Sequence, residues 1–288
     1  MEERVTFESQ GIKLSGILHI PDDIKPGEKR PACLVLHGFG SNKDSKACIS
    51  PAKLLEKWGY IALRFDMRGC GQSEGPRAHI ICMEQVEDTK SAVTYLMSRP
   101  EVDPAKIASA GHSFGAAVSV YAGGVDKRIA AVISSGGWGD GQTKFELQHS
   151  KPGAWEKFTK TLERGREHRA KTGESIKINR YDIVPIPEGM RGNLAPGSIM
   201  EFPLETVESM LAFRANDVVG DISPRPLLLL HASTDSVTPT EQSIILFQKA
   251  GMPADLHLVA DVDHFMFAEN NEMVTDIVRT WLKKQFGQ

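Results

Sequence analysis

The chain has 288 residues, of which 41% are hydrophobic and 25% are charged. This composition is that of an ordinary globular protein, so a disordered, collagen-like or coiled-coil chain is excluded. The 34 Lys and Arg residues against 37 Asp and Glu give a net charge of −3, and nucleic-acid binders usually carry a basic excess. We therefore expect no nucleic-acid partner. The length suits two domains, or one domain with an insertion.

The spacing of the cysteines and the hydropathy of the chain indicate the cellular compartment of the protein. The four cysteines show no zinc-site spacing, so we expect unpaired thiols in a reducing compartment. The first ten residues lack the basic and apolar segments of a secretory signal, and no apolar run approaches the roughly 20 residues that span a bilayer. These features predict a cytoplasmic protein without a membrane partner. The cysteines are Cys33, Cys48, Cys70 and Cys82.

Strand and helix patterns follow one another along most of the chain. A hairpin is predicted first, with strands at 5–9 and 12–20 around the Gln10-Gly11 turn. Alternating strands and helices then indicate a parallel sheet with helices on both faces, which is the α/β class. The later strands are expected at 32–36, 60–65, 106–110, 129–134, 226–230 and 255–259, and the helices at 52–58, 82–97, 113–122, 240–250 and 273–286.

One long segment interrupts this alternation. Residues 137–221 hold two helical patterns, at 154–171 and 203–213, and a loop-like stretch at 185–196. Loops of that length are rare in a compact domain, so we interpret 137–221 as an inserted, mainly helical cap. The core is then formed by 1–136 and 222–288.

The cap contains a basic stretch. Residues 151–180 hold nine Lys and Arg against four Glu. A solvent-exposed helix face would account for such a stretch. The more specific hypothesis is that it attracts an anionic substrate, such as a free carboxylate or a coenzyme A thioester.

The candidate nucleophile is Ser113. The sequence Gly111-His112-Ser113-Phe114-Gly115 fits G-x-S-x-G, and a predicted strand precedes it while a small-residue helix follows it. A serine on a sharp strand-to-helix turn sits in strained backbone, and flanking glycines prevent clashes. Its hydroxyl then projects at the carboxyl edge of the sheet, where α/β proteins bind ligands.

Serine needs a base, and the base needs a carboxylate to orient it. His264 lies in a loop before the last helix, and Asp235 follows the strand at 226–230. The resulting chain order of nucleophile, carboxylate and base, which is Ser113, Asp235, His264, is one of the orders in which catalytic triads occur. Asp140 is a competing carboxylate, whereas Asp263 is too close in sequence to reach the ring of His264. The other histidines suit the role less well: His37 is expected to support its loop, His112 to point elsewhere, and His149, His168 and His231 to lack the loop context.

A negative tetrahedral intermediate needs preorganised donors. One is expected from the N–H of Phe114, which follows the serine. The second is expected from the loop after Leu36, where we favour the N–H of Phe39. A tight glycine turn without a catalytic donor is the alternative for that loop.

Four motifs together resemble the α/β-hydrolase superfamily, over residues 1–136 and 222–288. The segment 66–75, D-x-R-G-x-G-x-S-x-G, resembles a loop of esterases, including cinnamoyl-esterase-like enzymes, and of X-prolyl-peptidase-like hydrolases; we expect its Asp66 and Arg68 to brace the active-site loops. The resemblance implies an α/β-hydrolase fold and hydrolysis of an acyl bond. The other motifs are Leu36-His37-Gly38-Phe39-Gly40-Ser41, Gly111–Gly115 and the loops of Asp235 and His264.

The expected activity is hydrolysis of a carboxylic ester of a small molecule through an acyl-enzyme. A thioesterase, acyltransferase, lactonase, peptidase or carbon–carbon hydrolase would use the same triad, and a non-catalytic binding module is a third option. No metal or cofactor is expected, because protein groups and water supply the chemistry. Since cap or edge-strand surfaces often form dimers in such enzymes, analogy leaves a homodimer open.

Overall fold

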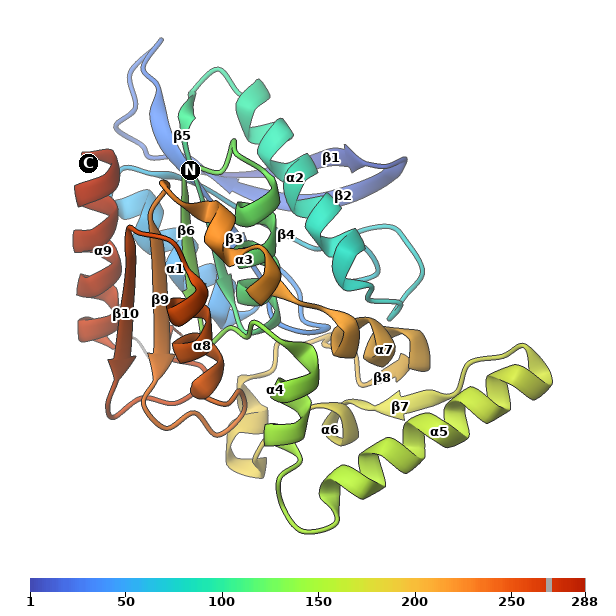
Figure 1. Ribbon diagram of the computed structural model, residues 1–288. Helices are drawn as coiled ribbons and strands as arrows, with labels where there is room; N and C mark the ends of the chain where they lie inside the picture. Colours follow the sequence, from blue (N-terminus) through green and yellow to red (C-terminus); the bar gives the residue numbers. More distant parts are fainter. Residues whose placement is uncertain (268–270, 288) are drawn as a thin grey trace.

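The structure is a computed structural model that describes residues 1–267 and 271–287. Residues 268–270 and 288, which fall in the predicted range 222–288, lie outside it. An eight-stranded sheet in the order β1-β2-β4-β3-β5-β6-β9-β10 forms its centre (Figure 1). β2 pairs antiparallel with β1 and β4, and all other neighbours are parallel. The strands are β1 (Glu2–Ser9), β2 (Ile12–His19), β3 (Arg30–Leu36), β4 (Ile61–Phe65), β5 (Val102–His112), β6 (Ala131–Ser135), β9 (Leu227–Ala232) and β10 (Ala254–Val259).

Helices cover both faces of this sheet, which confirms the predicted α/β class. Successive leucines of β9 alternate between the faces, because side chains point to opposite sides of a strand. Leu227 and Leu229 join the core beneath α2 and α3, whereas Leu228 and Leu230 join the core beneath α1 and α9. Each fully buried leucine contributes roughly 1.5–3 kcal/mol. The covering helices are α1 (Lys46–Lys57), α2 (Cys82–Ser98), α3 (Phe114–Val125), α8 (Glu241–Lys249) and α9 (Glu272–Phe286).

Some element boundaries differ from the sequence prediction. Helix α1 begins at Lys46 rather than at residue 52, so Pro51 lies inside it. Proline removes the bond to the carbonyl four residues earlier and its ring crowds that carbonyl, whereas burial of Ala47 and Cys48 favours the additional turn. Strand β5 also starts earlier than predicted, at Val102, where it continues its pairing with β3.

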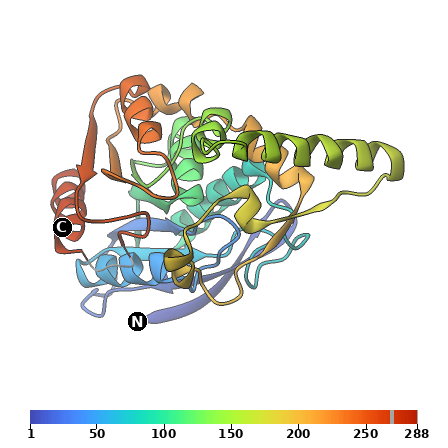
Figure 2. The same cartoon turned by 90° about the horizontal axis from the view of Figure 1, so that it is seen from below.

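The segment 137–221 adds no strand to the central sheet, and all of its residues are described. A two-stranded sheet, with Ile178 opposite Phe202, and the helix α4 were not predicted. Helix α5 projects from the body of the molecule in both views (Figures 1 and 2). The elements of the segment 137–221 are α4 (Gly141–Gln148), α5 (Ala154–Thr172), β7 (Lys177–Asn179), α6 (Arg180–Ile183), η1 (Glu188–Asn193), β8 (Glu201–Pro203), α7 (Leu204–Ala212), η2 (Ala215–Asp217) and η3 (Val219–Ile222).

Helix α7 anchors this segment to the start of α2. The Thr206 hydroxyl accepts a hydrogen bond from the Ile80 N–H at 2.9 Å, and the Ser209 hydroxyl accepts one from the Cys82 N–H at 2.8 Å. The first N–H groups of a helix lack intrahelical acceptors, so α7 caps the start of α2 from outside. The segment and the sheet consequently share one continuous apolar core.

The four cysteines are free and buried, as predicted. Burial raises the pKa of each thiol to about 12, because a thiolate is costly in an apolar environment. No helix among residues 1–267 and 271–287 has the length and apolarity needed to cross a membrane.

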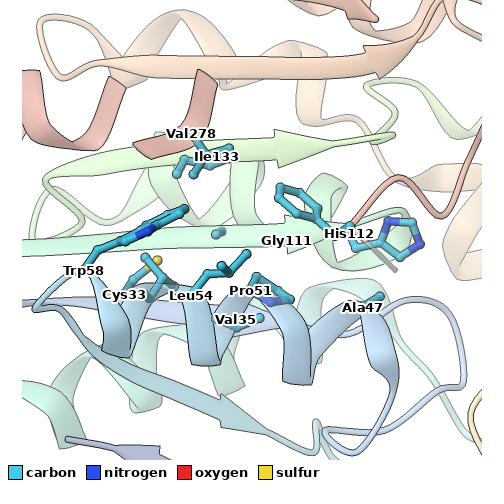
Figure 3. Close-up of a pocket in the computed structure, with 13 residues that line it drawn as sticks. Cys33, Val35, Ala47, Pro51, Leu54, Trp58, Gly111, His112, Ile133 and Val278 are labelled. Carbon is cyan, nitrogen blue, oxygen red and sulfur yellow. The ribbon is translucent and has the colours of Figure 1, made fainter. Parts of the chain in front are cut away.

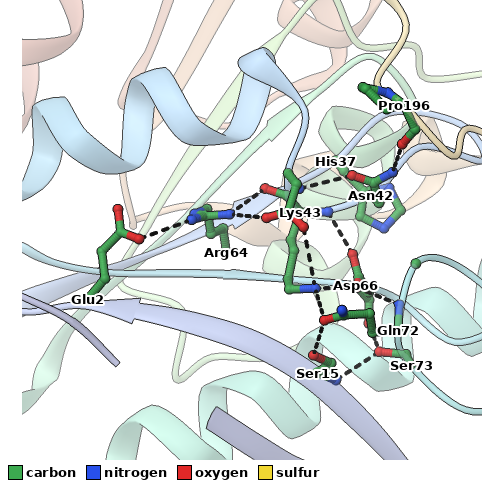
Figure 4. Close-up of polar contacts among 12 residues, drawn as sticks. Glu2, Ser15, His37, Asn42, Lys43, Arg64, Asp66, Gln72, Ser73 and Pro196 are labelled. Atoms are coloured by element: carbon green, nitrogen blue, oxygen red, sulfur yellow. Dashed lines mark hydrogen bonds and ion pairs between the residues drawn. The ribbon is translucent and has the colours of Figure 1, made fainter. Parts of the chain in front are cut away.

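A buried polar network joins the end of β4 to the loop after β3 (Figure 4). The Asp66 carboxylate accepts hydrogen bonds from the Lys43 N–H at 2.6 Å and from the Lys43 ammonium at 2.8 Å. It also accepts the Gln72 N–H at 2.8 Å. Arg68 instead pairs with Asp88 of α2, with Nη2 2.6 Å from a carboxylate oxygen. Asp66 therefore braces the loop that lies beside Ser113, and Arg68 fixes the segment after β4 to α2.

Replacing Asp66 by alanine should destabilise the protein by about 3–5 kcal/mol, because the Lys43 ammonium loses its buried partner and keeps, among the described carboxylates, only the exposed one of Asp44 at 3.7 Å. Urea denaturation monitored by circular dichroism measures this loss. The control Glu156→Ala breaks an ion pair whose two side chains are both 68% exposed, and it should leave the midpoint nearly unchanged. Equal effects of the two substitutions would contradict the assignment.

Candidate active site

Ser113 occupies a strained turn between β5 and α3. Its backbone adopts φ 56° and ψ −116°, a conformation that non-glycine residues rarely take. The flanking glycines are required by close approach rather than by their own φ angles. A Cβ on Gly111 would lie 2.1 Å from the Gly115 carbonyl oxygen, and one on Gly115 would lie 2.6 Å from the His37 carbonyl oxygen. The turn leaves the Ser113 side chain half-buried.

Asp235 and His264 meet at the same edge of the sheet. His264 Nδ1 lies 2.8 Å from Asp235 Oδ2, and the other carboxylate oxygen accepts the N–H groups of Val237 and Thr238 at 2.8 and 2.7 Å. A carboxylate at Nδ1 fixes that nitrogen as the donor, so Nε2 is left as the acceptor. The two loops therefore hold an oriented imidazole.

A second histidine, His231, contacts the Asp235 carboxylate, and the sequence did not predict this contact. Its Nε2 lies 3.3 Å from Asp235 Oδ2, and its Nδ1 lies 2.6 Å from the Ser243 hydroxyl. Burial alone would raise the pKa of the Asp235 carboxyl. The attraction of His264 and the hydrogen bonds from His231 and His264 hold that pKa well below its usual range. The only signal in the sequence was that His231 stands at the end of β9, four residues before Asp235.

The prediction that His112 points elsewhere is wrong, because its ring lies against that of His264. Its ring centroid lies 4.8 Å from that of His264 and 5.4 Å from that of Phe265. The strand β5 continues through His112, so its side chain projects into the site before the sharp turn at Ser113. Burial, and then the nearby charge of His264, lower the pKa of His112 to about 3, and the ring remains neutral at physiological pH.

Ser113 and His264 line one cavity of about 40 Å³. The loop after β3 contributes Gly38 and Phe39 to its wall, and the segment 137–221 contributes Arg180, which was not predicted. No hydrogen bond joins the Ser113 hydroxyl to His264 within the described part of the chain; such bonds often tighten only when substrate is bound. The cavity is small beside typical ligand pockets of about 300–1,000 Å³.

Of the two predicted oxyanion donors, Phe39 lies on the loop that lines this cavity, and Phe114 begins α3 next to Ser113. A Cβ on Gly38 would come within 3.7 Å of the Ser113 Cβ, so the next amide, that of Phe39, is close to the serine. Neither the Phe39 nor the Phe114 N–H donates a hydrogen bond to a described residue. Phe39 lines the cavity, and Phe114 directly follows Ser113 in the chain.

His37 supports the first of these loops, as predicted. Its Nε2 accepts the Met67 N–H at 3.1 Å, and its Nδ1 therefore carries the proton that it donates to the Gly38 carbonyl at 2.8 Å. Burial lowers the pKa of His37, which keeps the ring in this neutral form.

The alternative carboxylates have other partners. Asp140 accepts the Thr143 N–H at the start of α4 and pairs with Arg214 Nε at 3.1 Å. Asp263 accepts the N–H of Ser236 and that of His264 itself. Asp263 therefore fixes the backbone of both loops and leaves the imidazole to Asp235. Within the described residues, no group of three or more His, Cys, Asp and Glu side chains could hold a metal ion.

A second cavity, of about 30 Å³, lies behind His112 and Ala47, which line both cavities (Figure 3). Its other walls are apolar side chains of α1, α9 and the sheet, among them Leu54 and Val278. Apart from the neutral ring of His112 and the thiol of Cys33, whose pKa burial raises to about 12, the described residues that line it offer no side chain for acid–base or nucleophilic chemistry.

A larger groove of about 700 Å³ runs along the outside of the Asp235 loop. It shares Ile186 and Val237 with the cavity that Ser113 and His264 line, and Lys151 and Arg191 are among its polar walls.

Comparison with known proteins places the chain among hydrolases. The family described as serine aminopeptidase, S33, matches residues 27–182. A thiohydrolase, apmlB, of Arthrinium phaeospermum is 26% identical over 277 residues, which cover 85% of this chain and 84% of that protein. A polyketide transferase, grgF, of a Penicillium species is 29% identical over 253 residues, which cover 82% of each chain.

Solved structures share the whole fold. The crystal structure of the α/β hydrolase GrgF from Penicillium sp. sh18 superposes with a TM-score of 0.80 at 24% identity, with both chains fully covered. The structure of Est1E from Butyrivibrio proteoclasticus with ferulic acid bound has a TM-score of 0.72 at 21% identity, covering 99% of this chain and 100% of that one. The resemblance to the α/β-hydrolase superfamily is thereby confirmed.

His112 should make the stability depend on pH. Its pKa is about 3 in the folded protein and about 6.5 in an unfolded chain, so between these values only the unfolded state binds the proton. Stability should fall by up to about 1.4 kcal/mol per pH unit as pH drops below 6.5. Urea denaturation at several pH values should show a shallower fall for His112→Asn, with a constant difference from wild type above pH 7. Parallel curves at low pH would contradict this.

Proposed function

Because the chain belongs to the serine aminopeptidase S33 family of α/β-hydrolases, we propose that it hydrolyses a carboxylic ester of a small molecule through an acyl-enzyme on Ser113. One observation carries the proposal: Ser113 stands on a strained turn in the same cavity as His264, whose Nδ1 lies 2.8 Å from Asp235. This is the arrangement of nucleophile, base and orienting carboxylate that serine hydrolysis needs.

In the first step the Ser113 hydroxyl attacks the ester carbonyl while His264 Nε2 takes its proton. The Asp235 carboxylate, whose depressed pKa keeps it ionised, stabilises the imidazolium that forms. The N–H groups of Phe39 and Phe114 hydrogen-bond the negative oxygen of the tetrahedral intermediate. Collapse of the intermediate breaks the bond to the alcohol, which leaves with the proton from His264.

In the second step a water molecule attacks the acyl-enzyme. His264 removes a proton from the water, and the second tetrahedral intermediate releases the acid and restores the Ser113 hydroxyl. The segment 137–221 acts as a cap that covers the serine. The acyl group occupies the cavity of about 40 Å³, and the alcohol extends into the groove of about 700 Å³. This favours short acyl groups.

A thioester is the second candidate substrate. The relatives named thiohydrolase and polyketide transferase favour it, and the adjoining groove could take a long thiol. The same acyl-enzyme would form, with a thiol as leaving group. Parallel assays of matched oxygen esters and thioesters, with and without an added acceptor alcohol, separate ester hydrolysis, thioester hydrolysis and acyl transfer.

Ser113→Ala should abolish catalysis. Wild type mixed with a 4-nitrophenyl ester of a short acid should release a burst of nitrophenol equal to the enzyme concentration, provided that deacylation is the slower step. The variant should lose the burst and at least about 10³-fold in kcat. A fluorophosphonate should label wild type alone, and unchanged turnover in the variant would refute the proposal.

Asp235→Asn should lower kcat by roughly 10³–10⁴-fold, because an amide neither stabilises the imidazolium nor selects the required tautomer. Asp140→Asn is the matched control: its amide oxygen can still cap α4, and Asp140 has no contact with His264. Kinetics with the same ester should leave this control near the wild-type rate. A comparable loss in both variants would remove Asp235 from its assigned role.

A further inference from the structure

Arg180 is a buried cation without a carboxylate partner in the described part of the chain. Its residue exposure is 3%, and it forms no ion pair with residues 1–267 or 271–287, whereas the buried Arg68 pairs with Asp88 at 2.6 Å. Burying an unpaired charge is costly. Burial lowers the pKa of Arg180 to about 10, so the guanidinium still carries its charge at neutral pH.

The hydrogen bonds of this side chain are incomplete. Nη1 donates to the Ile199 carbonyl at 2.8 Å, and Nη2 donates to the Phe39 carbonyl. A guanidinium has five N–H donors, so three remain. Nε is buried and has no partner among the described residues. Neutral carbonyls thus use two donors and neutralise none of the charge.

The guanidinium belongs to the catalytic cavity. Arg180 lines the cavity that contains Ser113 and His264. Its Cζ lies 5.4 Å from the centroid of the Phe39 ring and 5.8 Å from that of Phe202. These rings and the two carbonyls hold the side chain at the base of the cap, beside the expected oxyanion loop. An anion that enters the cavity would supply the counter-charge that Arg180 lacks among the described residues.

We propose that Arg180 binds a carboxylate on the acyl part of the substrate, so that the preferred substrates are monoesters or monothioesters of short dicarboxylic acids. This rests on the proposed function and adds the class of acyl group. A carboxylate offers the planar pair of acceptors that a guanidinium binds best. The acyl side is chosen because the small cavity contains both Ser113 and Arg180, whereas the larger groove has room for the leaving group.

The first test uses wild type alone. kcat/KM is measured for 4-nitrophenyl monoesters of succinic, glutaric and adipic acids and for the amides of the same half-acids, with spontaneous hydrolysis subtracted. At one chain length or more the carboxylate ester should be favoured at least tenfold over its amide. A third series carries the carboxylate on the alcohol and should show no such ratio. Equal rates for acid and amide at every length, or a preference confined to the third series, would overturn the assignment.

Two variants then locate the preference. Arg180→Met should reduce the acid-to-amide ratio to within about threefold of unity, and Arg180→Lys should retain part of it because the charge remains. The matched control is Arg225→Met, which also removes an arginine bound only to main-chain carbonyls but lies outside the catalytic cavity. It should keep the wild-type ratio. A ratio that persists in Arg180→Met would overturn the proposal.

The ratio is read within one protein, so a partial loss of folded enzyme cancels from it. Fluorophosphonate titration counts the active sites of each variant. If Arg180→Met does not fold, the wild-type ratio and the Lys variant decide the matter. Turnover by Ser113→Ala would defeat the proposed function itself, whereas Ser-dependent hydrolysis without any preference for carboxylates would defeat only the assignment of Arg180.

Discussion

The close approach of α3 to the end of β3 is the constraint on which the candidate site depends. A Cβ on Gly115 would lie 2.6 Å from the carbonyl oxygens of both Leu36 and His37. Only glycine allows this contact, and the chain reaches it through the left-handed backbone of Ser113. The contact sets the first turn of α3 beside the loop after β3. The contact therefore brings together the two backbone segments that carry the proposed oxyanion donors, the amides of Phe39 and Phe114.

The loop after β3 is held from both sides. Below it, Asp66 binds the backbone and the ammonium of Lys43. Above it, the segment 137–221 contributes the Ile199 N–H, which donates to the Gly40 carbonyl at 2.8 Å, and Arg180, which donates to Phe39. The loop and the segment above it are thus one hydrogen-bonded unit. A substrate group that binds Arg180 is coupled through Phe39 to the amides that would stabilise the oxyanion.

The sequence predicted those parts of the site that follow from strand order. The carboxyl ends of parallel strands share one edge of a sheet, so residues placed after β5, β9 and β10 lie along the same edge. This argument selected Ser113, Asp235 and His264, and the structure brings Asp235 and His264 together. It could not find His231 or the inward position of His112, because both depend on side-chain direction. It also could not find Arg180, whose position depends on how an irregular segment folds over the sheet.

The positive charges of the basic stretch 151–180 lie in two different environments. Most of the cations on α5 are exposed and several have partners, such as Lys157 with Asp182 at 3.1 Å and Arg169 with Glu205 at 2.7 Å. Exposed pairs of this kind are weak and screened by salt, so they give little selectivity. Arg180 ends the same stretch but is buried, and no described carboxylate pairs with it; a buried charge acts in a low dielectric. The excess of positive charge visible in the sequence therefore matters for substrate choice through this one residue.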